Sequence, residues 1–118
     1  MELTEQEQRT ADALARAMAP AVDANEVGKV LAFWRRWRDP QKVLALVERL
    51  PRSGLVRTGR TRGYYEAMGR AFVQYLRGVR PEAFGPLLGW AFRLMRYYQL
   101  EQGPSDRWPS GERERRRR

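Results

Sequence analysis

The sequence predicts an all-α protein, a small bundle of about five helices with a disordered basic C-terminal tail. Apolar residues recur at the three- and four-residue spacing of a helix, and no segment alternates with the two-residue period of a strand. Proline and glycine divide this pattern into five segments. Because 118 residues with 42% hydrophobic content suit one core, we expect a single helical domain over residues 1–103 and a disordered arginine-rich tail over residues 104–118.

The first two helices are expected over about residues 5–19 and 24–38. Thr4 and Glu7 have the spacing of a capping box at the start of the first helix, and Asp23 suits the cap position of the second. The second helix also carries an apolar stripe at helical spacing, formed by Val27, Val30, Leu31, Trp34 and Trp37.

A third helix of about ten residues is expected between Asp39, which is suited to cap it, and Pro51. The stretch GLVRTGRTRGYY, residues 54–65, then resembles a glycine-punctuated connection. We therefore expect the fourth helix to start after Gly63 and to close at Gly78.

The fifth helix is expected to begin at Pro81, or alternatively at Pro86, because proline fits the first turn of a helix. Its apolar residues continue at helical spacing to Tyr98, and the helix should end at Gly103. The residues beyond it have too little apolar content to offset the entropy of ordering them.

The chain has no cysteine and no histidine. These absences remove the commonest general base, the most nucleophilic side chain and the commonest metal ligand. We therefore expect no enzymatic activity, no metal and no cofactor. The N-terminal residues MELTEQEQRT are acidic, unlike a signal peptide, and no apolar run approaches the roughly 18 residues of a membrane span. The expected location is the cytoplasm, with no membrane partner.

The positive charge is concentrated in the middle of the chain. Residues 1–26 carry a net charge of −4, residues 27–100 one of +11 and residues 101–118 one of +2, within a total of +9. A basic folded body indicates a polyanionic partner, usually a nucleic acid. All but two of the 23 cations are arginine, which binds phosphate through a bidentate fork, although a GC-rich genome would also favour arginine.

The candidate nucleic-acid-binding residues are arginines that lie beside aromatic stripes or between glycines. They are Arg35, Arg38, Arg57, Arg60, Arg62, Arg70, Arg77, Arg93 and Arg96. On the expected helices, members of a pair spaced three or seven apart share one side. The alternative for each pair is an ordinary solvated helix surface. For Trp34 and Trp37, burial in the core is favoured over stacking on bases.

Residues 54–65 raise a separate question, because Gly54 to Thr61 comes within one residue of a P-loop, with Arg60 in place of lysine. A P-loop requires a strand before the glycine loop, and here a helix and Pro51 precede it, so we reject nucleotide hydrolysis. Two interpretations stay open. The stretch is either a plain connector or a row of phosphate contacts from Arg57, Arg60 and Arg62, held to the bundle by the two tyrosines that follow.

Three stretches in order carry a resemblance: VDANEVGKVLAFWRRW at 22–37, YYEAMGRAFVQYL at 64–76 and FGPLLGWAFRLMRYYQLEQG at 84–103. Together they resemble the small all-helical subunit of Csm-type (type III-A) CRISPR RNA-guided effector complexes. The middle stretch places Gly69 and Arg70 on the family's aromatic-Ala-x-Gly-Arg positions. The family's threonine-rich cap is replaced here by Asp-Ala-Asn, and the arginine tail is not a family feature. The small subunits of Cmr-type complexes, also basic helical bundles, are similar too.

The resemblance implies a non-catalytic subunit of a ribonucleoprotein complex in antiviral defence. Its implied partners are RNA or other single-stranded nucleic acid and other subunits of an effector complex, including copies of itself. Two further classes stay open: a helical adaptor or inhibitor that docks on an acidic protein surface, and a small DNA-binding regulator. The regulator would need a polar recognition helix after a tight turn, and none stands out in the sequence.

Overall fold

The computed structural model describes residues 2–56 and 58–102, and all regular secondary structure in these residues is helical. The elements in order are α1 Glu5–Met18, α2 Ala24–Trp37, α3 Pro40–Arg49, the 3-10 turn η1 Leu50–Arg52, α4 Gly59–Tyr75 and α5 Pro81–Gln102. The expected all-α bundle of five helices is confirmed. The tail predicted for residues 104–118 lies outside the described residues.

The first three helices begin at the caps that the sequence indicates. The Thr4 hydroxyl accepts a hydrogen bond from the Glu7 amide at 3.0 Å, and the Glu7 carboxylate accepts one from the Thr4 amide at 2.9 Å. Asp23 caps α2 through the Asn25 amide, and Asp39 caps α3. These side chains satisfy amides that have no partner within a helix, so each start is decided locally.

The start of α4 differs from expectation, whereas α5 begins at the first of its two expected starts. α4 begins at Gly59, not after Gly63, because the Thr58 hydroxyl accepts a hydrogen bond from the Thr61 amide and so supplies a cap that the sequence analysis overlooked. α5 begins at Pro81, with Pro86 inside the helix. α2 ends at Trp37 because Arg38 adopts the left-handed conformation, with φ of 54°, and turns the chain toward α3.

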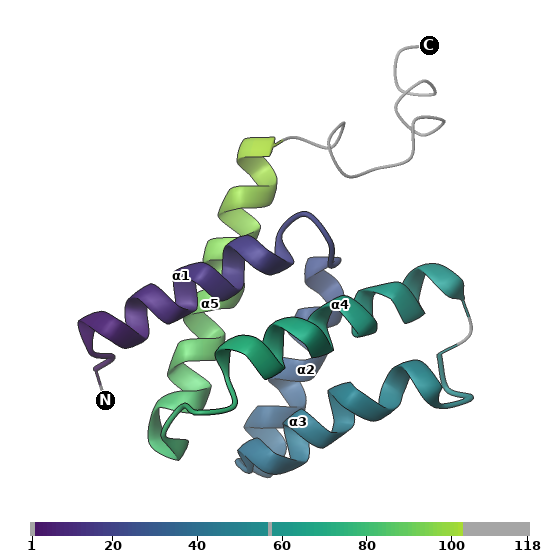
Figure 1. Ribbon diagram of the computed structural model, residues 1–118, viewed down its shortest axis with the longest axis horizontal. Coiled ribbons are helices and arrows are strands. Elements are labelled where there is room, and N and C mark those ends of the chain that lie inside the picture. The colour runs from purple at the N-terminus through teal and green to yellow at the C-terminus, as the bar shows by residue number, and fades with distance from the viewer. Residues whose placement is uncertain (1, 57, 103–118) are drawn as a thin grey trace.

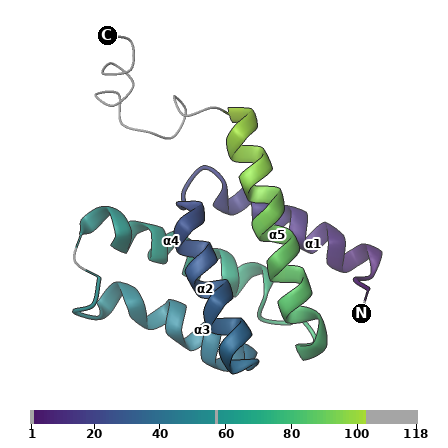
Figure 2. The same cartoon turned by 180° about the vertical axis from the view of Figure 1, so that it is seen from behind.

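The helices form two groups. In Figure 1, α1, α3 and α4 lie in front and α2 and α5 lie behind them; Figure 2 shows the α2 and α5 side. α3 and α4 run antiparallel next to each other, and α5 packs on both α1 and α2. Among the described helices, none combines the length and the apolar character that crossing a membrane requires.

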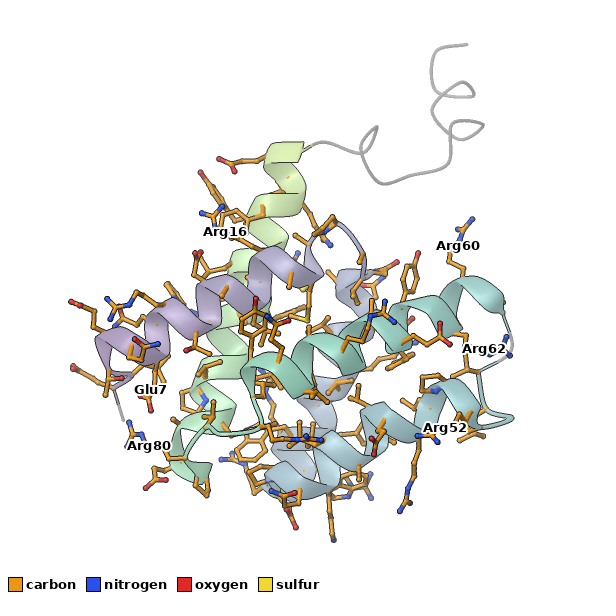
Figure 3. The ribbon with its side chains drawn as sticks, viewed as in Figure 1. Glu7, Arg16, Arg52, Arg60, Arg62 and Arg80 are labelled. Carbon is orange, nitrogen blue, oxygen red and sulfur yellow. The ribbon has the colours of Figure 1, made fainter. Side chains whose placement is uncertain are left out.

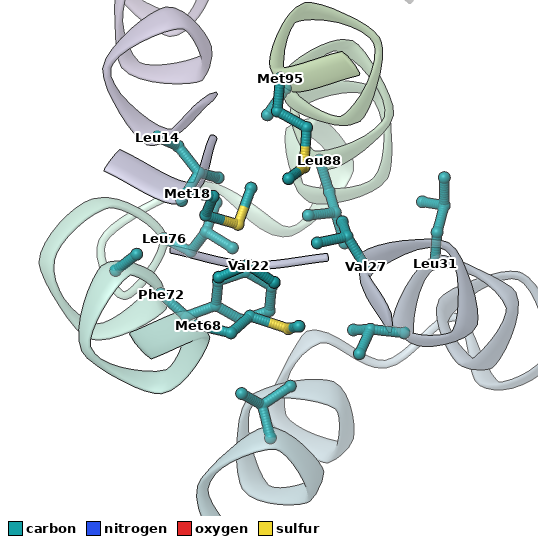
Figure 4. Close-up of a cluster of buried hydrophobic side chains, with 14 of the residues drawn as sticks. Leu14, Met18, Val22, Val27, Leu31, Met68, Phe72, Leu76, Leu88 and Met95 are labelled. Atoms are coloured by element: carbon teal, nitrogen blue, oxygen red, sulfur yellow. The ribbon is translucent and has the colours of Figure 1, made fainter. Parts of the chain in front are cut away.

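The core lies where α1, α2, α4 and α5 converge (Figure 4). Phe72 of α4 is fully buried at its centre, between apolar side chains of the other helices. The surrounding residues include Leu14, Met18, Val27, Met68, Leu76, Leu88 and Met95. Burial of this apolar surface is the main favourable contribution to folding, and it fixes which helix faces stay in contact with solvent.

An ion pair ties the start of α1 to the turn before α5. Arg80 donates to both carboxylate oxygens of Glu7, from Nε at 2.6 Å and from Nη2 at 2.9 Å, and Figure 3 shows the two residues together at one end of the bundle. This bidentate contact with a guanidinium, together with the Thr4 amide, lowers the pKa of Glu7 from 4.5 to about 2.

Glu7→Gln should therefore change how stability depends on acid. A carboxyl group with a lowered pKa stabilises the fold above its unfolded pKa, and this contribution is lost as the pH falls from about 4.5 through 2. Glutamine can still close the capping box, so the substitution removes mainly the ion pair. We expect the melting temperature of wild type to exceed that of the variant at pH 6 and the two to converge near pH 2. Parallel curves over this range would contradict the assignment.

Candidate nucleic-acid interface

The ion pairs of the described residues leave the candidate arginines aside. The four ion pairs join Arg9 to Glu5, Arg16 to Asp12, Lys29 to Glu26, and Arg80 to Glu7. All four carboxylates belong to α1 or to the first turn of α2. Eight of the nine candidates are described, and none of these eight forms an ion pair within the described part of the chain. The ninth, Arg57, lies outside it.

On α1, the charges of Asp12 and Arg16 neutralise each other. Arg16 contacts the Asp12 carboxylate at 2.9 Å and lies over the ring of Tyr98 on α5, 4.4 Å from its centroid. The Tyr98 hydroxyl donates a hydrogen bond to the same carboxylate. These two donors lower the pKa of Asp12, so the carboxylate stays charged and paired. Four of the six acidic residues among residues 1–26 thus form ion pairs in the described structure, two of them with arginines of α1 itself.

Four candidates belong to α2, to the residue that ends it or to α5, the two helices nearest the viewer in Figure 2, and we call them the α2–α5 face: Arg35, Arg38, Arg93 and Arg96. Arg35 and Arg38 line a shallow hollow of about 510 Å³ together with Gly85, Pro86 and Gly89 of α5. Glu82 also lines it, and its carboxylate offsets part of the positive charge.

Arg93 and Arg96 continue this face along α5. Arg93 follows Pro86 by seven residues and so shares its side of the helix. Arg96 covers Phe92, with its guanidinium 5.7 Å from the ring centroid, at the point where Phe92 approaches Gly28 of α2. The structure therefore brings together two arginine pairs that are more than fifty residues apart in the sequence.

The two tryptophans of α2 differ in how deeply they are buried. Trp34 packs against Phe84 at 5.2 Å between ring centroids and is partly buried, as expected. Trp37 is 38% exposed and stacks on Phe33, so its expected burial in the core was wrong. The reason is that α2 reaches past the end of the core before Arg38 turns the chain away.

Two other candidates, Arg70 and Arg77, line a groove between α3 and α4 with a volume of about 750 Å³. The groove also contains Arg52, which the sequence analysis missed although it follows the helix-ending Pro51. Its other polar lining includes the carboxylates of Glu48 and Glu66, which offset part of the positive charge. The apolar lining consists mainly of Leu44, Ala45, Val47, Phe72 and Val73.

The start of α4 separates Arg60 from Arg62. Because Gly59 already belongs to the helix, residues two apart point about 200° away from each other. Figure 3 shows Arg60 extending from one side and Arg62 from another, and Arg62 donates to the Val56 carbonyl at 3.4 Å. The two described arginines therefore do not form a continuous row of phosphate contacts.

The local structure around residues 54–61 is also not that of a P-loop. A helix does begin at Gly59-Arg60-Thr61, contrary to expectation, but the turn η1 and not a strand precedes it. The Thr61 hydroxyl accepts from Thr58 at 2.9 Å, which serves the helix cap. The segment is held to the bundle by Tyr65, which is buried and donates to the Glu26 carboxylate at 2.8 Å. Burial and this carboxylate raise the pKa of the Tyr65 phenol.

Within the described residues, no group of three or more carboxylates is placed to hold a metal ion. Comparison with known proteins adds no identification, since no family model, no curated protein and no solved structure matches this chain. The site therefore has to be judged from its own residues.

Proposed function

We propose that the chain binds the backbone of single-stranded RNA or another single-stranded nucleic acid as a non-catalytic, cytoplasmic subunit of a ribonucleoprotein complex. The observation that supports it most is the α2–α5 face, where four arginines without a carboxylate partner in the described structure lie on two adjacent helices. An arginine that is not paired within its own protein is free to exchange counterions for phosphates, which drives backbone binding. The resemblance to the small subunit of Csm-type CRISPR effectors suggests the kind of complex.

The geometry favours a backbone ligand over a compact one. The hollow between α2 and α5 is shallow and contains Arg35 and Arg38, whereas Arg93 and Arg96 lie outside it, further along α5, so the four cations are spread along the face and do not surround one point. A single strand presents its phosphates in such a line. A small anionic metabolite would instead need donors that surround it.

The test compares two triple variants that lose equal charge. Arg35→Gln, Arg93→Gln and Arg96→Gln change the α2–α5 face, whereas Arg52→Gln, Arg70→Gln and Arg77→Gln change the α3–α4 groove. Each phosphate contact on a single strand contributes about −0.7 to the slope of log K against log salt, so the first variant should flatten this slope by about two. We also expect its affinity for a 20-nucleotide RNA to fall at least about tenfold in ~0.1 M salt.

Filter binding over a salt series measures both quantities, and thermal denaturation checks that the variants stay folded. The groove variant should keep most of the affinity. If wild type binds RNA with no salt dependence, or not at all, the proposed function is wrong. If the groove variant loses more affinity than the face variant, the backbone lies between α3 and α4 instead.

The α3–α4 groove supports a second candidate, a helical adaptor that docks on an acidic protein. Its apolar lining and three arginines suit an acidic amphipathic helix, which would place apolar side chains in the groove and carboxylates at its rim. A protein partner that is retained after RNase treatment, and lost in the groove variant alone, would favour this candidate.

A further inference from the structure

The outward side of α5 carries aromatic rings as well as arginines. Trp90 is 42% exposed and Tyr97 is 56% exposed, and their spacing of seven positions places both on one side of the helix. Arg93 lies on the same side between them, and exposed Arg96 precedes Tyr97. We call Trp90, Arg93, Arg96 and Tyr97 the α5 strip.

These rings are not part of the core. The buried side of α5 is formed by other residues: Phe84, Leu87, Leu88, Ala91 and Met95. Single exposed apolar residues are common on protein surfaces, but here two exposed aromatic rings flank two arginines along one helix. Stacking platforms for single-stranded nucleic acids combine these same two residue types, because rings stack on bases while cations follow the backbone.

The dimensions of the strip suit a single strand. A spacing of seven helical residues separates Trp90 from Tyr97 by about 10 Å, which is the axial length of about three nucleotides at the ~3.4 Å rise of a base-stacked strand. The Glu101 carboxylate, one turn further along α5, raises the pKa of the Tyr97 phenol. Since that carboxylate repels phosphate, the backbone should lie on the Arg93 and Arg96 side of the rings.

We infer that the α5 strip binds unpaired bases by stacking, with Trp90 and Tyr97 as the two platforms and Arg93 and Arg96 on the adjoining phosphates. This inference rests on the proposed function and extends it, because it specifies single strands over duplexes and gives the bases a role. Neither ring is needed for a ligand that contacts the protein through phosphates alone.

The test uses three probes: a 20-nucleotide oligouridine, an abasic strand of the same length and charge, and a 20-base-pair RNA duplex. Wild type should bind oligouridine at least about tenfold more tightly than the abasic strand, as expected if one or two bases stack. Trp90→Ala and Tyr97→Ala should each remove much of this difference, and Trp90→Phe and Tyr97→Phe, which keep a ring, should restore most of it. Leu55→Ala, at an exposed apolar position before α4 that lines neither the hollow nor the groove, is the control and should bind as wild type does.

Several results would overturn the inference. Equal binding of oligouridine and the abasic strand, with a normal salt slope, removes the stacking role and leaves the proposed function intact. If the duplex binds as tightly as oligouridine, the chain has no preference for single strands. If none of the three probes binds at low salt, both the inference about the α5 strip and the proposed function are wrong. If Trp90→Ala instead abolishes self-association in sedimentation equilibrium and leaves RNA binding unchanged, the strip is a contact between copies of the chain.

Discussion

Gln99→Leu is expected to lower the free energy of unfolding by about 2 to 4 kcal/mol, because it leaves two buried carbonyl groups without a donor. Gln99 is a buried polar residue of α5, 6% exposed. Its amide nitrogen donates to the carbonyls of Ala19 at 3.0 Å and of Val22 at 2.8 Å. Both acceptors lie between α1 and α2, so one side chain holds the α1–α2 connection to the last helix.

Chemical denaturation measures this effect, and two further variants define its cause. Gln74→Leu makes the same change at an exposed position of α4 and should alter stability by no more than about 0.5 kcal/mol. Gln99→Glu should be severely destabilised at neutral pH, where the carboxylate donates nothing, and should recover in part in acid, where the protonated group donates one hydrogen bond. A Gln99→Leu variant as stable as wild type would show that these carbonyls do not depend on Gln99.

Gly85→Ala is expected to lower the free energy of unfolding by about 2 to 3 kcal/mol, because its methyl group has no space. A Cβ atom at position 85 would overlap Nε1 of Trp34 and lie 2.5 Å from its Cε2. The rigid indole would have to leave its contact with Phe84, and the packing between α2 and α5 would be lost there. Calorimetry of the purified variant gives the change directly.

Gly89→Ala is the matched control for Gly85→Ala. Gly89 lies one turn further along α5, and nothing lies within 4 Å of the position of its missing Cβ. Alanine is a better helix former than glycine, so this variant should gain up to about 1 kcal/mol. Replacing Trp34 by leucine should rescue Gly85→Ala in part. If both glycine variants are equally stable, the close approach of Trp34 to α5 is not needed by the fold.

The sequence by itself determined the fold class and most helix boundaries. Caps such as Thr4, Asp23 and Asp39 bond to amides two or three residues away, so their effect can be judged without knowing the rest of the chain. The start of α4 was also local, because Thr58 caps Thr61, but this cap was overlooked since the glycines of residues 54–63 were interpreted as a connection between helices.

The grouping of the candidate arginines was decided only by the tertiary structure. Arg35 and Arg96 reach one face because α5 packs along α2, with Gly28 against Phe92 and Gly85 against Trp34. These contacts join residues more than fifty positions apart, and their geometry depends on the size and packing of many side chains at once. Helical spacing within one segment predicts which residues share a side, but not which other helix that side meets. For the same reason Trp90 and Tyr97 were recognised as an exposed pair only after the core had been located.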